Sequence, residues 1–464
     1  MLTVISSVLA ACAAVGPDYK RPQNLAPAQF SEAANATEIQ DKLAVSSTWW
    51  TLYQDAELNA LMDKALQNNT DIRLAVARVE ELEAYSKEIG SGIFPTINLD
   101  SSGSRLRASS IGRMPFPPGA NSLQKDFILQ LGTSFELDFW GKARRARESA
   151  RAQALSTRYA KDTVALTLTG MVASSYLQIR SLDAQIALSR DSLRSRDESL
   201  SLTQRRLQGG IASALDVDQA EVSRANLQAQ IAELIRLRAL GEHQLAILTG
   251  ELDLKLAAGD IKTLPMPPQP PAGLPSSLLE ARPDIRQAEQ NMVAANAKIG
   301  VAKAALFPTI SLTANYGGES GDLSNILKSA ARIWTGGLSL NLPIFDAGRI
   351  NSRIQQASAQ QKQALISYEA AIQSAFREVN DALVNLRQNS EREVALNTSQ
   401  QSAKKAYEIS INRYKSGYSA YLEVLDAERV YNDSALAYVQ NRQARLIASV
   451  DLFKALGGGW EAQP

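Results

Sequence analysis

Residues 349–416 read RINSRIQQASAQQKQALISYEAAIQSAFREVNDALVNLRQNSEREVALNTSQQSAKKAYEISINRYKS, which is 68 consecutive positions without a glycine or a proline. Residues 142–208 form a second stretch of this kind, interrupted only by Gly170. At a rise of about 1.5 Å per residue, each stretch predicts a helix roughly 100 Å long. Globular proteins have helices of about 11–12 residues on average, so these two stretches predict a long projection on the solvent side.

Each long stretch ends at a glycine turn, and a returning helix of about 39 residues follows. The two turns are Gly209-Gly210 and Ser416-Gly417. An apolar residue recurs every seven positions in the first stretch, at Ile179, Ile186, Leu193, Leu200 and Leu207. This spacing is the seam of a coiled coil, so we expect close antiparallel packing against a neighbouring helix.

The chain contains an internal repeat. Residues 71–73 (Asp-Ile-Arg) recur at 284–286, and residues 94–97 (Phe-Pro-Thr-Ile) recur at 307–310, in both cases 213 positions later. After these landmarks the offset becomes 207, as in the match of Gly210 with Gly417. The change of six positions predicts a variable loop inside the segment that follows Phe-Pro-Thr-Ile.

The repeat gives the predicted organisation of the chain. We expect a signal peptide at 1–11, a lipid-anchored and equatorial segment at 12–69, repeat 1 at 70–250, a proline-rich linker at 251–282, repeat 2 at 283–457 and a tail at 458–464. Each repeat should contain a helix, a β-hairpin and a long helix pair. The hairpins are expected at about 96–138 and 309–342, and the helical turns near 209–216 and 416–426.

Apolar and polar residues alternate in the hairpin segments, which is typical of strands with two different faces. In residues 127–139 one face is almost entirely apolar, whereas the other carries Gln130, Ser134, Glu136 and Asp138. Strands of roughly 10 residues can cross a bilayer when tilted, but the alternation fits a soluble sheet packed on a helix equally well. In lipid, four strands must close a barrel with other copies, either eight strands in a dimer or 12 in a trimer. The polar face would then line an aqueous lumen.

The single cysteine follows the short apolar run Leu2–Ala11. Leu9-Ala10-Ala11-Cys12 resembles a bacterial lipobox, in which the cysteine is acylated after cleavage. The run is too short to span a bilayer and fits a signal peptide, although no lysine or arginine precedes it. The alternative is a buried free cysteine.

The composition argues against several other classes of protein. Lysine plus arginine is 49 and aspartate plus glutamate is 48, so no basic excess suggests a nucleic-acid partner. With one cysteine and one histidine, His243, the chain has little material for a metal site or a Ser-His-Asp triad. We therefore predict no catalytic residues, no cofactor and no metal, and a protein that is not an enzyme.

Motifs along nearly the whole chain resemble those of the TolC-like outer-membrane factors, in particular the lipoprotein branch of OprM and NodT. The motifs are WWTLYQDAELNALMDKALQNNTDIRLAVARV from Trp49, LPSSLLEARPDIRQAE from Leu274, LPIFDAGRI from Leu342, RYKSGYSAYLEVLDAERVY from Arg413 and DLFKALGGGW from Asp451. The resemblance implies a mixed α and β membrane protein, a homotrimer with a 12-stranded barrel and a periplasmic α-helical tunnel. It also implies a periplasmic membrane-fusion adaptor and an inner-membrane transporter of the resistance-nodulation-division type as partners.

The resemblance also identifies the two glycine turns as periplasmic tips. It implies docking of the adaptor by residues that match the tip pattern of the family: Arg206, Gly210, Leu215, Arg413, Gly417 and Leu422. Asp216, Glu423 and Asp426 would form rings of negative charge at the tunnel gate, which favour cations. The alternative for these acids is ordinary charge at a helix N-terminus. Some relatives have an ion-pairing residue at the position of Ser419, so the resemblance does not carry their closed-state latch over to this sequence.

The function expected from these features is the outer-membrane channel of a tripartite efflux pump for drugs or other small molecules. The expected location is the bacterial outer membrane, with a lipid anchor and a periplasmic projection. Two alternatives are a type I protein-secretion channel and a periplasmic coiled-coil structural lipoprotein. The two amphipathic hairpins argue against the second alternative.

Overall fold

The computed structural model describes residues 14–22, 30–33, 46–107, 109, 111, 123–269, 280 and 282–459. The predicted signal peptide at 1–11, the predicted lipidation site Cys12 and residues 460–464 of the tail lie outside these residues. The chain forms two compact units. Unit 1 comprises Met1–Pro22, Val79–Thr157 and Ala288–Tyr368, and unit 2 comprises Gln23–Arg78, Arg158–Gln287 and Glu369–Pro464.

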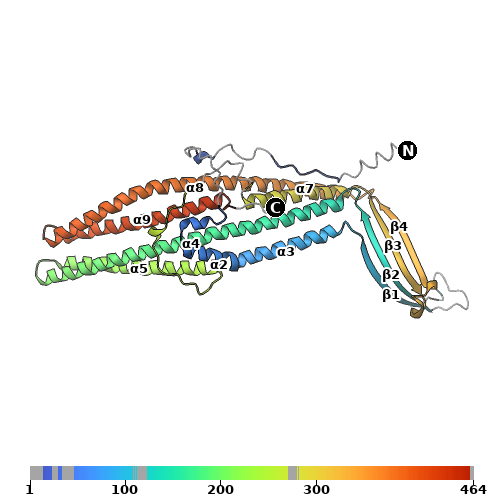
Figure 1. The fold of residues 1–464 in the computed structure, drawn as a ribbon, viewed down its shortest axis with the longest axis horizontal. Helices are drawn as coiled ribbons and strands as arrows, with labels where there is room; N and C mark the ends of the chain where they lie inside the picture. The colour runs from blue at the N-terminus through green and yellow to red at the C-terminus, as the bar shows by residue number, and fades with distance from the viewer. Residues whose placement is uncertain are drawn as a thin grey trace. The chain divides into compact units, whose positions relative to one another are not determined.

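Unit 1 contains a four-stranded antiparallel sheet in the order β1-β2-β3-β4 (Figure 1). The strands are β1 (Thr96–Arg107), β2 (Leu123–Leu137), β3 (Thr309–Ser320) and β4 (Arg332–Asn341). The prediction of four strands is confirmed. The sequence did not predict that β2 pairs with β3, with Phe127 opposite Ser320 and Leu137 opposite Ile310. This pairing joins the two hairpins into one continuous sheet.

Short 3-10 helices η5 (Leu323–Asn325) and η6 (Ser329–Ala331) connect β3 to β4. At the other end of the sheet the strands join helices. Phe94 and Pro95 lie between α3 (Thr70–Ser91) and β1, and Phe307 and Pro308 precede β3 after α7 (Pro283–Ala304). Proline disfavours helical backbone at the residue before it, which explains the same helix end in both repeats.

The segment from Ala14 to Pro22 is attached to the helices of unit 1. Val15 N donates a hydrogen bond to Trp140 O (2.9 Å), and Arg145 Nη2 lies 2.6 Å from Asp18 Oδ1. Tyr19 Oη donates to Glu289 Oε1 on α7 (3.1 Å). Ala14 lies against Gly141, where a Cβ atom would come within 2.4 Å of the Ala14 Cβ. The segment is therefore fixed from its first described residue, at the junction of β2 and the following helix.

The long helices are those that the sequence predicts. α4 (Lys142–Gln208) and α8 (Arg349–Lys415) have 67 residues each, and the returning helices are α5 (Ala214–Thr249) and α9 (Tyr421–Ala455). Gly170 lies inside α4 without ending it, since the helix continues to Gln208. None of the helices in the described residues is long and apolar enough to cross a membrane.

The predicted seam lies in the contact between α4 and α5, within unit 2. Ile186 packs against Leu234 of α5, and Ile179 lies where a Cβ on Gly241 would come within 3.0 Å of its side chain. Leu200 is also buried, Leu193 is half-buried and Leu207 is exposed. The packing seam therefore runs from Ile179 to Leu200 and ends before the turn.

The main hydrophobic core of unit 2 includes the first helices of the chain, which lie in the predicted equatorial segment at 12–69 but were not predicted as helices. The short helices of unit 2 are η2 (Ser31–Ala33), η3 (Trp49–Tyr53), η4 (Ile261–Thr263) and α2 (Ala56–Asn68), and all but η2 contribute residues to this core. Trp49 stacks on Phe453 of α9 with 5.4 Å between ring centroids, and both side chains are buried. Asp55 caps α2 by accepting from the backbone of Glu57 and Leu58. This core fixes the returning helices α5 and α9 at the ends distant in sequence from the turns.

Candidate functional site

The two faces of the sheet differ in chemistry. On one face Leu99 lies opposite Leu131, Leu131 opposite Tyr316, and Tyr316 opposite Trp334, so one row of large apolar side chains crosses all four strands. A second row on this face joins Phe135, Leu312 and Leu338. These side chains are not covered by the rest of the described chain: Trp334 is 77 % exposed and Leu338 is 69 % exposed. Such a surface is typical of a strand face that contacts lipid.

The opposite face carries mostly polar side chains, and its large apolar members are Leu106, Ile128 and Ile333. Gln130 lies opposite Asp100, Ser134 opposite Thr313, and Glu136 opposite Ser311. Another row carries Asn98, Asn315 and Thr335, in which Asn315 Nδ2 donates to Thr335 Oγ1 (3.2 Å). Gln130, Ser134 and Glu136 thus share a face suited to contact with water, as the alternation predicts.

Asp138 does not belong to this polar face, contrary to the sequence-based prediction. β2 ends at Leu137, and the Asp138 carboxylate accepts hydrogen bonds from the backbone of Ala143 and Arg144 at 3.0 Å each. It therefore caps the N-terminus of α4. The alternation continues in the sequence beyond the end of the strand, which is why the pattern alone misplaced this residue.

The two turns between the long helices have the same backbone geometry. Gly210 has φ +74° and Gly417 has φ +82°, which is the left-handed region that glycine adopts at low cost. Ile211 N donates to Arg206 O and Tyr418 N donates to Arg413 O, both at 2.9 Å. With the bonds from Gly210 N to Leu207 O and from Gly417 N to Tyr414 O, each turn is a Schellman motif. The backbone carbonyls of Arg206 and Arg413, the two predicted docking arginines, therefore accept the hydrogen bonds that end their helices.

Apolar side chains project from both turns into solvent. Ile211 and Leu215 are exposed at the first turn, and Tyr418 and Leu422 are exposed at the equivalent positions of the second. Apart from the glycine and its two neighbours in the chain, no described atom lies within 4 Å of the position that a Cβ would take on Gly210 or Gly417. The predicted docking residues Gly210, Leu215, Gly417 and Leu422 are thus accessible on this chain.

The two predicted docking arginines already have partners. The Arg206 guanidinium lies over the ring of Tyr414, 4.3 Å from its centroid, and Nη2 donates to Lys415 O (3.4 Å). This contact links the first turn to α8, within unit 2. Arg413 Nε lies 3.1 Å from Glu423 Oε1, which closes the second turn on itself. The side chains of Arg206 and Arg413 therefore stabilise the two turns, and both residues also lie near the surfaces of these turns.

Each predicted gate acid also has a local partner. Asp216 and Ser213 form a capping box, in which Ser213 N donates to Asp216 Oδ2 (3.0 Å) and Asp216 N to Ser213 Oγ (3.2 Å). Glu423 pairs with Arg413, and Asp426 Oδ1 lies 2.7 Å from Arg429 Nη2. The alternative of helix N-terminal charge thus describes Asp216 well. The Ser419 hydroxyl is buried and has no hydrogen-bond partner in the described residues.

Sequence reasoning missed a buried ion pair between the two helix pairs. Arg196 of α4 lies 3.3 Å from Glu428 of α9, and the two side chains are 11 % and 3 % exposed. Burial raises the pKa of Glu428, and the attraction of Arg196 opposes this shift. Beside the pair, a cavity of about 180 Å³ is lined by polar side chains that include Ser192, Tyr407 and Asn432. Neither residue type nor spacing identifies this pair, because the partners are 232 positions apart.

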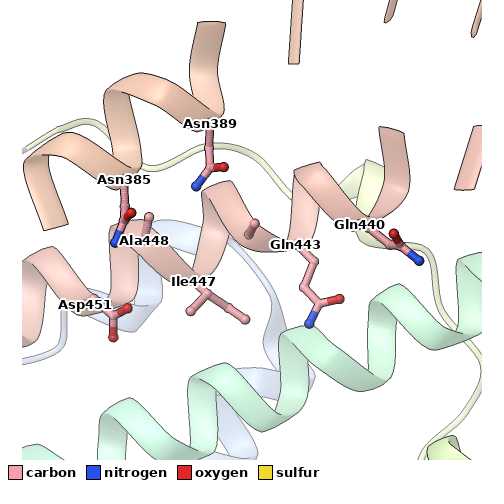
Figure 2. Close-up of a pocket in the computed structure, with 8 residues that line it drawn as sticks. Asn385, Asn389, Gln440, Gln443, Ile447, Ala448 and Asp451 are labelled. Atoms are coloured by element: carbon pink, nitrogen blue, oxygen red, sulfur yellow. The ribbon is translucent and has the colours of Figure 1, made fainter. Parts of the chain in front are cut away.

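A second hollow in unit 2 lies along α8 and α9. Figure 2 shows its lining, half of which is amide side chains: Asn385, Asn389, Gln440 and Gln443, together with Ile447, Ala448 and Asp451. Its volume is about 420 Å³. Burial raises the pKa of Asp451. In the described residues no group of three or more histidine, cysteine, aspartate or glutamate side chains could hold a metal ion.

Comparison with known proteins identifies the family. Residues 61–251 and 274–458 match the outer membrane efflux protein family. The chain belongs to this family. The two matched segments cover both repeats, so the internal duplication lies within the family match.

The relatives and solved structures agree with this assignment. The chain is 33 % identical over 472 residues to the toluene efflux pump outer membrane protein TtgC of Pseudomonas putida, covering 100 % of this chain and 96 % of TtgC. It is 32 % identical over 460 residues to the cation efflux system protein CusC of Escherichia coli, covering 98 % of each. The outer-membrane channel OprN superposes with a TM-score of 0.88 at 30 % identity, over 96 % of this chain and 99 % of OprN. The open state of the MtrE channel of Neisseria gonorrhoeae superposes with a TM-score of 0.87 at 30 % identity, over 97 % and 99 %.

This family member is therefore the outer-membrane channel component of an efflux pump, with its helices on the periplasmic side. The fold class and the outer-membrane location expected from the sequence are confirmed, and the lipid anchor stays a prediction. The family match also explains the two-faced sheet: the apolar face suits the membrane, and the polar face suits a water-filled passage.

Proposed function

We propose that three copies of this chain share one barrel of 12 strands, four from each copy, and pass drugs or other small molecules to the exterior. The observation that carries this proposal is the two-faced sheet with its exposed apolar rows. In the order β1-β2-β3-β4, each of the outer strands leaves one edge unpaired. Unpaired backbone groups in hydrocarbon cost several kcal/mol each, so the edges of one copy must pair with those of its neighbours.

The polar face of each sheet then forms the wall of the passage. Asp100, Gln130 and Ser134 contribute side chains that hydrate readily, and Glu136 adds a negative charge that Lys142 partly balances at 3.0 Å. A water-filled lumen with a net excess of carboxylates raises the barrier to anions and favours cations or neutral solutes. The wall of the lumen lets solutes pass and sets a preference for their charge, whereas the transporter selects the substrate.

The partners we propose are an inner-membrane transporter of the resistance-nodulation-division type and a periplasmic membrane-fusion adaptor. The adaptor would dock on the two turns of each chain, at Arg206, Gly210, Leu215, Arg413, Gly417 and Leu422. The exposed leucines and the open space around both glycines support this placement. Three chains would present six similar docking points. Asp216, Glu423 and Asp426 would stand near the narrow end of the tunnel as its gate.

We also propose that Cys12 carries a lipid after cleavage between Ala11 and Cys12. The attachment of Ala14–Pro22 to unit 1 supports this, because it fixes the chain two residues after Cys12, where β2 meets α4. An acyl chain there would be close to the membrane boundary of the sheet. Intact-mass spectrometry of the mature protein should show an acylated N-terminus in the wild type. A mature protein without acyl mass would exclude this anchor.

The experiment that tests the channel combines assembly with transport. Detergent-extracted protein should be a trimer by native mass spectrometry, and in a planar bilayer it should conduct ions. Expression in a strain that lacks its own outer-membrane efflux channel should restore resistance to small toxic compounds. A well-folded monomer would contradict the shared barrel. Restored export of a protein substrate without restored resistance would favour the type I secretion channel.

A further inference from the structure

The charged residues of the sheet are sorted by face without exception in the four described strands. The face follows from the strand register, because alternate residues point to opposite sides. The four acidic residues lie on the polar face: Asp100, Asp126, Glu136 and Glu319. The four basic residues lie on the apolar face: Arg105, Arg107, Lys125 and Arg332.

The four basic residues are also gathered at one end of the apolar face. Arg105 and Arg107 are among the last three residues of β1, Lys125 is the third residue of β2, and Arg332 is the first residue of β4. These are the ends that join the strand connections 108–122 and 321–331. Because the helices at the other end of the strands are periplasmic, the basic end lies at the outer leaflet of the membrane. We call these four residues the basic rim.

Two members of the basic rim face each other directly. Arg105 is the cross-strand partner of Lys125 in the β1–β2 pair. Like charges opposite one another destabilise a sheet, so this arrangement is unfavourable unless an anion lies between them. All four side chains are exposed, and none of them forms an ion pair with another described residue. The carboxylates that could have compensated them are on the opposite face.

The basic rim is continuous with the surface that faces lipid. Phe127 follows Lys125 on the same face of β2, and Trp334 follows Arg332 on the same face of β4. Beside Arg332, the Ile326 carbonyl lies over Gly318 on this face, and Leu327 in the same connection is 83 % exposed. Basic residues near a membrane interface extend their apolar stems along the hydrocarbon and keep the charge at headgroup level.

We propose that the basic rim binds the phosphate groups of anionic lipids in the outer leaflet. This inference rests on the proposed function, which turns the apolar face towards lipid. A guanidinium binds phosphate through two parallel hydrogen bonds, and the opposed pair Arg105 and Lys125 can hold one phosphate between them. A lipid is the fitting source of this phosphate, because its acyl chains would cover the apolar rows next to the rim. Free phosphate has no apolar part that could cover these rows.

The test uses native mass spectrometry of the full-length protein with a bis-phosphorylated glycolipid of the lipid A type as the probe. The wild type should retain at least about tenfold more probe than the variant with Arg105→Gln, Arg107→Gln, Lys125→Gln and Arg332→Gln. A matched control removes four exposed basic residues from α8 instead, with Arg353→Gln, Lys362→Gln, Lys404→Gln and Lys405→Gln, and should retain the probe like the wild type. Equal retention by the rim variant, or equal loss in the control, would overturn the proposal.

Two further arms identify the source of the phosphate. The same glycolipid without its phosphates should bind the wild type and the rim variant equally weakly. Inorganic phosphate should not displace the probe; displacement at equal concentration would mean a free-anion site and contradict the lipid assignment. If the fourfold variant does not assemble, Lys125→Gln alone must lower retention measurably for the proposal to stand. The oligomeric state is read in the same spectra, so a monomeric wild type that still retains the probe would refute the shared barrel and not the lipid site.

Discussion

Arg196 Nε lies 3.3 Å from Glu428 Oε1, and this buried contact connects α4 of the first helix pair to α9 of the second. Arg196 Nη1 also donates to Ser223 O on α5 at 2.5 Å, so one guanidinium joins three helices. Ser192 of α4 and Asn432 of α9 add a further hydrogen bond of 3.1 Å between these two helices. Each helix pair of unit 2 is thus linked to the other through polar contacts that lie beside the cavity of about 180 Å³.

Removing one partner of this pair should destabilise unit 2. Glu428→Ala leaves a nearly buried guanidinium without its carboxylate, and such a loss costs about 3 kcal/mol. Hydrogen exchange should show earlier opening of α9 around position 428 than in the wild type. Asp433→Ala is the matched control, because Asp433 pairs with Arg429 on the same helix but both side chains are exposed. Equal effects of the two substitutions would mean that burial does not decide the strength of the Arg196–Glu428 pair.

Glu428 should also make stability depend on pH. Burial raises its pKa above the ordinary value of 4.5. The folded state therefore binds this proton more tightly than the unfolded state. The stabilisation that comes from binding this proton is fully present below pH 4.5 and is lost as the pH rises through the raised pKa. Burial also raises the pKa of the neighbouring Tyr407 to about 12, so this tyrosine does not titrate in the same range.

The measurement is the thermal midpoint of the wild type minus that of Glu428→Gln at a series of pH values. This difference should fall as the pH rises from 4.5 towards neutrality, because only the wild type loses a proton at position 428. The subtraction removes the contribution of Asp451, whose pKa burial also raises. A difference that does not vary with pH would show that Glu428 titrates normally.

Much of the fold is readable from the sequence because it depends on local rules. The absence of glycine and proline predicted α8 (Arg349–Lys415) almost to the residue, and the period of two predicted the faces of β2. The misplacement of Asp138 has the same origin, since alternation does not show where hydrogen bonding to the next strand stops. A local pattern specifies an element and its faces, and it specifies the ends of that element less well.

The parts that could not be predicted depend on which surfaces meet. Arg196 and Glu428 are 232 positions apart, and nothing in their neighbourhoods marks one as the partner of the other. To predict that Arg105 lies opposite Lys125, one must know the register in which β1 pairs with β2, and the sequence of residues 108–122 does not reveal it. Likewise, the capping role of Asp216 depends on Ser213, a residue that the sequence reasoning had not connected with it.

Substitution of the turn glycines should separate docking from assembly. Gly210→Val and Gly417→Val force a β-branched residue into left-handed backbone, at a cost of about 1–2 kcal/mol each, and place a side chain on the exposed turn. Because no described atom beyond the neighbouring residues in the chain lies within 4 Å of either Cβ position, no clash should disturb the surrounding packing. We expect loss of efflux and of adaptor binding with the trimer intact.

The control for this experiment is asparagine at the same two positions. Asparagine tolerates left-handed backbone better than other residues with a Cβ, so Gly210→Asn and Gly417→Asn should retain more function than the valine variants. Adaptor binding and native mass spectrometry are measured on the same preparations. Dissociation of the trimer in the valine variants, with binding of the adaptor retained, would mean that these turns act in assembly and not in docking.

The gate proposal for the turn acids predicts a change in ion selectivity without a change in docking. In a trimer, Asp216, Glu423 and Asp426 would each form a ring of three negative charges, and their removal should lower the preference for cations. Asp216→Asn is the sharper substitution at the first position, because an amide oxygen can still accept the hydrogen bond from Ser213 N and preserve the capping box. Glu423→Gln and Asp426→Asn complete the set. The substitution Glu423→Gln also weakens the contact between position 423 and Arg413.

Planar-bilayer reversal potentials under a salt gradient measure this selectivity, with adaptor binding measured in parallel. The matched variant neutralises acids of the sheet instead, with Asp100→Asn, Asp126→Asn and Glu319→Gln, which removes the same charge from the polar face. If the gate sets the preference, the turn variant should lose more cation selectivity than the sheet variant, since charge acts most strongly where the passage is narrowest and least screened. Unchanged selectivity in the turn variant, together with a loss in the sheet variant, would assign charge selection to the sheet. The turn acids would then act only as helix caps and local ion-pair partners.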